Sequence, residues 1–136
     1  MNTFNFRRAV QLALALAAGV IATAARADIK DYKFELVDQI VKAGTTDRVI
    51  TVRLLNSKTG KPVPDAVVFA TRLDMAADGM PEMATRIALD PGTAEPGSYR
   101  FKATFGMEGR WLLSIGAKVQ GETGTLEGKF VITAKK

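Results

Sequence analysis

The chain has 136 residues, with 19 Lys and Arg residues against 14 Asp and Glu residues, and it contains no His and no Cys. The absence of His and Cys excludes Ser-His-Asp and Cys-His catalysis, ordinary zinc sites and cupredoxin-type copper sites. Basic residues do not cluster with aromatic residues, so the pattern of a nucleic-acid-binding surface is lacking. The sequence also lacks a phosphate-binding loop and a nucleophile elbow. We therefore expect a protein that is not an enzyme.

Residues 1–27 have the features of an export signal. Arg7 and Arg8 form a short basic region, and a long apolar segment follows. The sequence ARA, which ends at Ala27, places small residues at the −3 and −1 positions of a signal-peptidase site. We expect cleavage after Ala27 and a periplasmic protein that begins at Asp28. The alternative is an uncleaved membrane anchor, for which the apolar segment is at the short limit.

Removal of this segment changes the charge of the protein. The segment contains three Arg residues and no acidic residue, so the net charge falls from +5 to 16 − 14 = +2. Residues 28–136 are long enough to form one domain with its own core. Since Cys is absent, this domain must depend on apolar packing rather than on disulfides.

Short segments of residues 28–136 alternate apolar and polar side chains, which is typical of strands with one buried face. In one of them Trp111, Leu113 and Ile115 share one face, and Arg110 and Ser114 lie on the other. The predicted strands are residues 31–37, 47–56, 66–73, 84–90, 97–105, 110–119 and 126–134.

Gly and Pro mark the connections 56–66, 90–98 and 120–124. Short strands separated by such turns predict an immunoglobulin-like antiparallel β-sandwich of about seven strands. A closed five-stranded barrel is the structural alternative. The predicted core residues are Phe34, Ile50, Val52, Leu54, Phe101, Trp111, Leu113 and Ile115.

The segment DMAADGMPEM, residues 74–83, places Met75, Met80 and Met83 beside the Gly and Pro of a surface loop. Thioethers are soft, neutral ligands that suit Cu(I) and Ag(I), and they need no deprotonation before they bind. The alternative is that these methionines fill an irregular end of the core, which is a common use of Met.

Met107 precedes the predicted strand 110–119, and on a period of two it shares a face with Gly109 and Trp111. If the segment 74–83 folds back over this strand, all four thioethers and the indole converge. Trp111 can then lie over a bound cation through its π face, or it can be an ordinary core residue. Tyr99 follows a turn, and we expect its side chain to lock that corner.

Three carboxylates in the same segment, Asp74, Asp78 and Glu82, are four residues apart. They raise the alternative of a calcium site, but the segment lacks the alternating oxygen ligands of a calcium loop. We therefore interpret them as solvated loop residues.

Residues 58–119 resemble the FixH / YtkA-like family of exported bacterial domains. The resemblance depends on TGKPVPDAVVFATRLDM, then on DGMPEM, and then on PGSYRFKATFGMEGRW. It implies an immunoglobulin-like sandwich that acts in copper or silver handling or in cytochrome oxidase maturation. The closing GETGTLEGKFVI is similar to family members that are associated with periplasmic adaptors of resistance-nodulation-division (RND) heavy-metal efflux systems.

Two functions from different classes follow from these observations. In the first, the domain is a periplasmic binding module that holds Cu(I) or Ag(I) through Met75, Met80, Met83 and Met107. It would deliver the metal to a heavy-metal efflux or cytochrome oxidase assembly partner. In the second, it is a metal-free structural or interaction domain whose methionine segment docks on a partner such as an RND efflux adaptor.

Overall fold

The computed structural model describes residues 29–44, 46–91 and 95–136. The predicted signal peptide lies outside the described residues. Within them, no helix combines the length and the apolar character that a bilayer span requires. The elements in chain order are η1 (Ile29–Asp31), β1 (Tyr32–Leu36), β2 (Ile40–Lys42), β3 (Arg48–Asn56), β4 (Val67–Met75), η2 (Ala76–Asp78), β5 (Met80–Thr85), β6 (Ile87–Leu89), β7 (Ser98–Ala103), β8 (Gly109–Lys118) and β9 (Leu126–Lys135).

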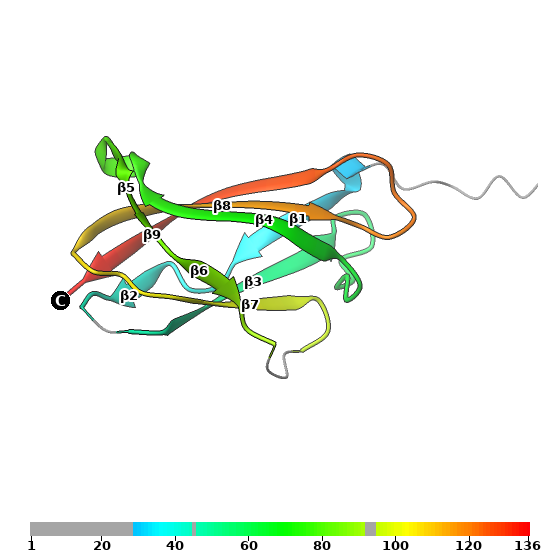
Figure 1. Ribbon diagram of the computed structural model, residues 1–136. Helices are drawn as coiled ribbons and strands as arrows, with labels where there is room; N and C mark the ends of the chain where they lie inside the picture. Colours follow the sequence, from blue (N-terminus) through cyan, green and yellow to red (C-terminus); the bar gives the residue numbers. More distant parts are fainter. Residues whose placement is uncertain (1–28, 45, 92–94) are drawn as a thin grey trace, which may run out of the picture.

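The strands form two sheets that stack as layers (Figure 1). One sheet has the order β1-β3-β7-β6 and the other has the order β2-β9-β8-β4-β5. Strand pairing is antiparallel except between β2 and β9, which run parallel. The predicted immunoglobulin-like β-sandwich is therefore confirmed. The barrel alternative is wrong, because the described strands form two separate sheets rather than one closed sheet.

The seven predicted strands are all present, but the described residues contain two more, β2 and β5. The predicted strand 84–90 is also split, because β5 ends at Thr85 in one sheet and β6 starts at Ile87 in the other. β2 has only three residues and pairs, at the edge of its sheet, with the end of the last strand, β9. Such a short edge strand has no room for an alternating pattern.

The segment 74–83 is not a surface loop, and that prediction is wrong. It contains the end of β4, the 3₁₀ turn η2 and the start of β5. Gly79 closes the turn with a φ of 74°, and its N–H donates to the Ala76 carbonyl at 2.9 Å. A left-handed φ of this kind favours Gly. Pro81 lies on β5 at the edge of its sheet, where a residue without an N–H is tolerated.

The space between the sheets is filled by the residues that the alternation predicted. All eight predicted core residues are buried, so this prediction is confirmed. Burial of each such side chain stabilises the fold by roughly 1.5–3 kcal/mol. Trp111 packs against Phe105 in an edge-to-face arrangement, with the ring centroids 5.7 Å apart. This aromatic pair lies at the start of β8, close to the candidate site.

Tyr99 locks a corner of the chain, although not the turn that precedes it. Its hydroxyl donates to the Val63 carbonyl at 2.7 Å and accepts from the Ala66 N–H at 3.0 Å. Burial raises the pKa of this hydroxyl, so it remains protonated and able to donate. Tyr99, on β7 beside β3, therefore fixes the connection between β3 and β4, which leads from one sheet to the other.

Candidate functional site

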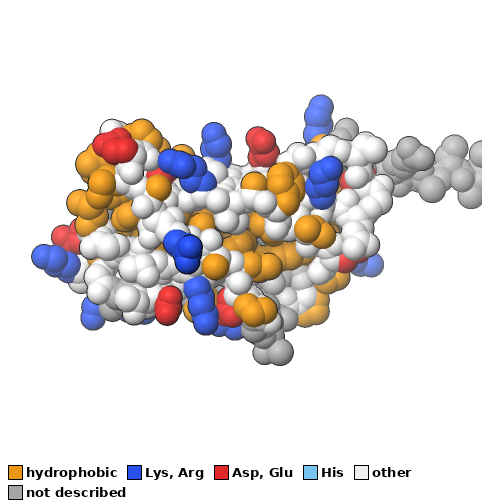
Figure 2. Space-filling view, in the orientation of Figure 1, with side chains coloured by type: hydrophobic (Ala, Val, Ile, Leu, Met, Phe, Trp, Pro, Cys, Tyr) orange, Lys and Arg blue, Asp and Glu red, His pale blue; other side chains and the backbone are white. Residues whose placement is uncertain are grey.

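The end of β4, η2 and β5, residues 73–85, form an arm that we call the methionine hairpin. It lies at the same end of the sandwich as the connection 104–108 between β7 and β8 (Figure 1). Hydrophobic side chains gather on the surface at this end (Figure 2). The structure thus brings the two methionine-bearing segments of the sequence to one place.

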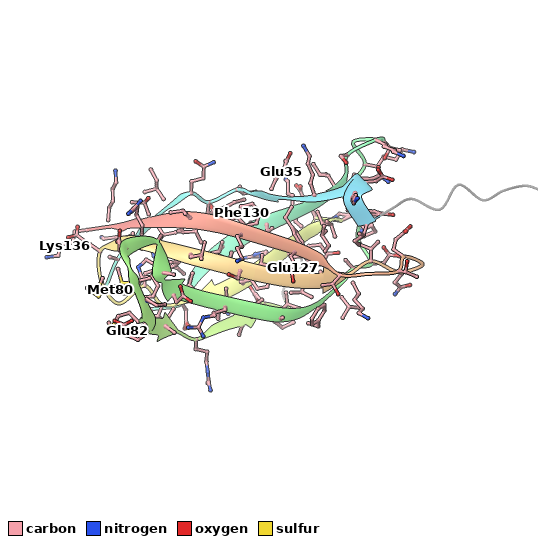
Figure 3. The ribbon with its side chains drawn as sticks, turned by 90° about the horizontal axis from the view of Figure 1, so that it is seen from above. Glu35, Met80, Glu82, Glu127, Phe130 and Lys136 are labelled. Carbon is pink, nitrogen blue, oxygen red and sulfur yellow. The ribbon has the colours of Figure 1, made fainter. Side chains whose placement is uncertain are left out.

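Residues 81–83 bulge out of the methionine hairpin. Met75 pairs with Met80 and Asp74 pairs with Ala84, so one step on β4 corresponds to four steps on β5. The three residues between these pairs have no partner on β4. Figure 3 shows Met80 and Glu82 at the end of the molecule that also carries the C-terminal Lys136. The bulge therefore places Met83 outside the regular pairing of the sheet, where its side chain is exposed.

A first arginine clamp, Arg110 with Asp78, holds the hairpin on β8. The Arg110 backbone N–H and Nε donate to the two Asp78 carboxylate oxygens at 2.7 and 2.8 Å. Arg110 Nη2 also donates to the Ala77 carbonyl at 2.8 Å. The backbone hydrogen bond, followed by the side-chain hydrogen bond and the charge of Arg110, holds the pKa of Asp78 below its ordinary value.

A second arginine clamp, Arg72 with Asp74, holds the bulge. Arg72 Nε donates to the Asp74 carboxylate, and Arg72 Nη2 donates to the Pro81 carbonyl at 3.0 Å. Asp74 is only 5% exposed and also accepts from the Ala76 N–H at 2.9 Å. Burial raises the pKa of Asp74, but the hydrogen bonds from Ala76 and Arg72 outweigh it and the net pKa is lowered.

Acid should weaken the methionine hairpin through these two carboxylates. Their pKa values are lower in the folded protein than their ordinary values. The stability that they contribute is therefore present above the unfolded-state pKa, about 4, and is lost as the pH falls through the folded-state values. We expect the free energy of unfolding of Asp74→Asn, measured by urea unfolding, to fall less than that of the parent as the pH is lowered below about 4. An equally steep fall in both proteins would contradict this role.

The four methionines of the predicted metal site occupy three different environments. Met75 is 1% exposed and belongs to the core. Met80 is partly buried and packs against that core. Met83 and Met107 are each 42% exposed. The structure thus separates one buried thioether from two that solvent reaches.

Met83 and Met107 line one shallow hollow of about 310 Å³ together with Trp111. Trp111 is 3% exposed, so most of its ring is core. Its indole N–H donates to the Met107 carbonyl at 3.2 Å, which ties the connection 104–108 to β8. The remaining lining residues are Ala84, Thr85, Thr104 and Gly106.

The two walls of the hollow are joined directly. The Thr85 hydroxyl, on the methionine hairpin, donates to the Thr104 carbonyl at 2.9 Å. Every lining residue of the hollow is neutral. The hollow is therefore lined by two methionine side chains and an indole, with no carboxylate among its lining residues.

The carboxylates of the segment do not form a calcium site in the described part of the chain. Asp74 and Asp78 are held by Arg72 and Arg110, and Glu82 lies on the exposed bulge. No group of three or more His, Cys, Asp or Glu residues is arranged there to hold a metal ion. The interpretation of Asp74 as a solvated loop residue is wrong, because its carboxylate is buried and paired.

Arg72 and Arg110 position the methionine hairpin, and neither was among the residues predicted for the site. Arg72 and Asp74 are two residues apart on one strand, and a spacing of two places side chains on the same face. That spacing was a usable signal for this pair. Arg110 and Asp78 are 32 residues apart, so their pairing depends on the tertiary fold.

Comparison with known proteins confirms the predicted resemblance to the YtkA-like family. The YtkA-like family model matches residues 26–116, which is 91 of 136 residues and includes the methionine hairpin and Trp111. No curated protein matches significantly. The predicted relation to FixH and to copper handling stays a prediction.

Two solved structures are similar in their coordinates. The Lin-41 filamin domain has a TM-score of 0.46 and 14% identity, over 77% of this chain and 92% of that chain. The ZirS C-terminal domain has a TM-score of 0.45 and 15% identity, over 79% of this chain and 67% of that chain. The YtkA-like family model, in contrast, matches more than half of the length of this chain, so the chain belongs to the YtkA-like family.

Proposed function

We propose that this YtkA-like domain is a non-enzymatic binding module that holds Cu(I) or Ag(I) at the hollow between Met83 and Met107. The observation that carries the proposal is the position of these two thioethers. They come from separate segments, they are equally exposed, and they line the same hollow. Thioether sulfur prefers soft cations such as Cu(I) over hard ones.

The neutral lining of the hollow supports the same choice of metal. Calcium and magnesium require oxygen ligands, usually including carboxylates, and the lining residues include none. A monovalent soft cation needs less compensating negative charge from its ligands than a divalent cation does. We assign Trp111 to the base of the hollow, where the part of its ring that faces the metal can contribute a cation–π interaction.

Burial narrows the ligand set that the sequence predicted. We assign Met83 and Met107 as the principal donors and Met80, at the start of β5, as an additional one. Met75 packs in the core, and we assign it to holding the methionine hairpin rather than to the metal. Both arginine clamps support the site by fixing the hairpin that carries Met80 and Met83.

The export signal at residues 1–27 supports a place in the periplasm. There, a thioether site has the advantage that it resists the oxidation to disulfides that threatens thiols. We propose that the module passes its metal to a heavy-metal efflux or cytochrome oxidase assembly protein. The resemblance of the GETGTLEGKFVI segment to adaptor-associated domains favours the efflux partner.

Replacement of either principal donor should weaken the site. We expect Met83→Leu and Met107→Leu each to reduce the Cu(I) affinity at least about tenfold, equivalent to about 1.4 kcal/mol. Leu and Met have similar volumes, so the free energy of unfolding should change little. The measurement is an anaerobic Cu(I) titration in competition with a chromophoric chelator, with the emission of Trp111, the only Trp, as a second readout.

Met75→Leu is the matched control, because it makes the same chemical change at the buried methionine. It should leave the Cu(I) affinity within about twofold of the parent, which is under 1 kcal/mol. If Met83→Leu/Met107→Leu binds Cu(I) as tightly as the parent, the metal site is wrong. The exposed thioethers would then favour the metal-free module, in which Met83 and Met107 provide adaptable contacts to a protein partner.

A further inference from the structure

We propose that Met83 and Met107 are a paired site of methionine oxidation, and that peroxides or hypochlorous acid switch off the hollow by converting both thioethers to sulfoxides. The selectivity of this modification depends only on the structure. Its effect on metal binding depends on the proposed function.

The selectivity follows from the division of the methionines by burial. Oxidation of Met follows the exposure of its sulfur to the oxidant. Met83 and Met107 are each 42% exposed, whereas Met75 is 1% exposed. Met80 is partly buried and lies between these extremes. Two methionine side chains that line one hollow are therefore open to oxidants, whereas the Met75 side chain is protected by the core.

The chemistry is a two-electron oxygen transfer. The thioether sulfur attacks one oxygen of hydrogen peroxide, the O–O bond breaks, and a sulfur–oxygen bond forms. After proton transfer the other oxygen leaves as water. The sulfur loses two electrons and the peroxide gains them, so atoms and charge balance without another reactant. Methionine sulfoxide reductases reverse the change with electrons from a dithiol.

Oxidation changes the ligands of the hollow from soft to hard. A sulfoxide is polar and presents an oxygen, whereas Cu(I) and Ag(I) select thioether sulfur. Because both side chains are already exposed to water, their sulfoxides can be solvated without opening the core. A sulfoxide at Met75 would instead place a polar group among buried apolar residues, at a cost in stability. The structure therefore allows loss of binding without loss of the fold.

The first experiment treats the metal-free protein with hydrogen peroxide and follows oxygen addition at each Met by peptide mass spectrometry. We expect Met83 and Met107 to be oxidised at least about tenfold faster than Met75, with Met80 between them, as their exposures require. In urea the differences should disappear, which shows that the fold creates them. If Met75 in the folded protein is oxidised as fast as Met83, the proposal is overturned.

The second experiment measures Cu(I) binding by the oxidised protein after the peroxide has been removed. The affinity should fall at least about tenfold and should return after treatment with methionine sulfoxide reductases and a dithiol. An oxidised protein that retains the affinity of the parent overturns the switch. If the unmodified protein fails to bind Cu(I), the proposed function fails and the switch fails with it. Selective oxidation in the first experiment would still identify Met83 and Met107 as the modification site.

Discussion

Trp111→Ala is expected to lower the free energy of unfolding by about 3–5 kcal/mol, the usual cost of removing a large buried aromatic side chain. The indole is 3% exposed and packs edge-to-face on Phe105. Its N–H also donates to the Met107 carbonyl. The substitution therefore removes core volume and leaves the connection 104–108 without its anchor on β8.

Trp111→Phe separates these two effects, because it retains an aromatic ring and removes only the indole N–H and part of the ring. We expect it to cost less than the Ala variant, and to loosen the connection that carries Met107. Urea unfolding followed by circular dichroism gives the free energies without depending on Trp emission. A loss below about 1 kcal/mol for Trp111→Ala would mean that the residue is not part of the core.

The long strands could be predicted because each has one face in the core and one in solvent. β8 is the clearest example, since Trp111, Leu113 and Ile115 are buried at alternate positions. Because successive side chains of a strand point to opposite faces, apolar residues at every second position indicate this geometry. The local pattern was therefore sufficient to predict the long strands that have one face in the core.

The two missed strands lie at sheet edges, where the pattern fails for physical reasons. β2 is too short to alternate, and it pairs with β9 from far along the chain. β5 carries Pro81 and a bulge of three residues, so most of its residues are exposed. Gly79 and Pro81 predicted a loop because the same residues favour turns and tolerate edge strands.

The burial of Met75 could have been recognised from the sequence. Leu73 is the last apolar residue of the predicted strand 66–73, and Met75 is two residues further along. β4 in fact continues to Met75, so both side chains point into the core. The proximity of Met83 to Met107 could not have been recognised in this way, because it depends on the bulge and on two arginine clamps.

Gly109 is the residue at which the core, the methionine hairpin and β8 meet. Its φ is 141°, a value that favours Gly. A Cβ at this position would overlap the Met75 methyl group and lie 2.7 Å from an Asp78 carboxylate oxygen. Met75 is buried and Asp78 is held by Arg110, so neither neighbour can move away freely.

Gly109→Ala is therefore expected to lower the free energy of unfolding by about 2–4 kcal/mol, from backbone strain together with overpacking. The strain should be relieved by displacement of η2 from β8, which breaks the contact of Asp78 with Arg110 and loosens the pairing of β5 with β4. Amide hydrogen exchange in β5 should accelerate more than exchange in β3, on the opposite sheet. Gly106→Ala is the matched control, because Gly106 has an ordinary φ and no atom within 4 Å of an added Cβ. If the two variants unfold at the same urea concentration, the close approach at Gly109 does not hold the hairpin in place.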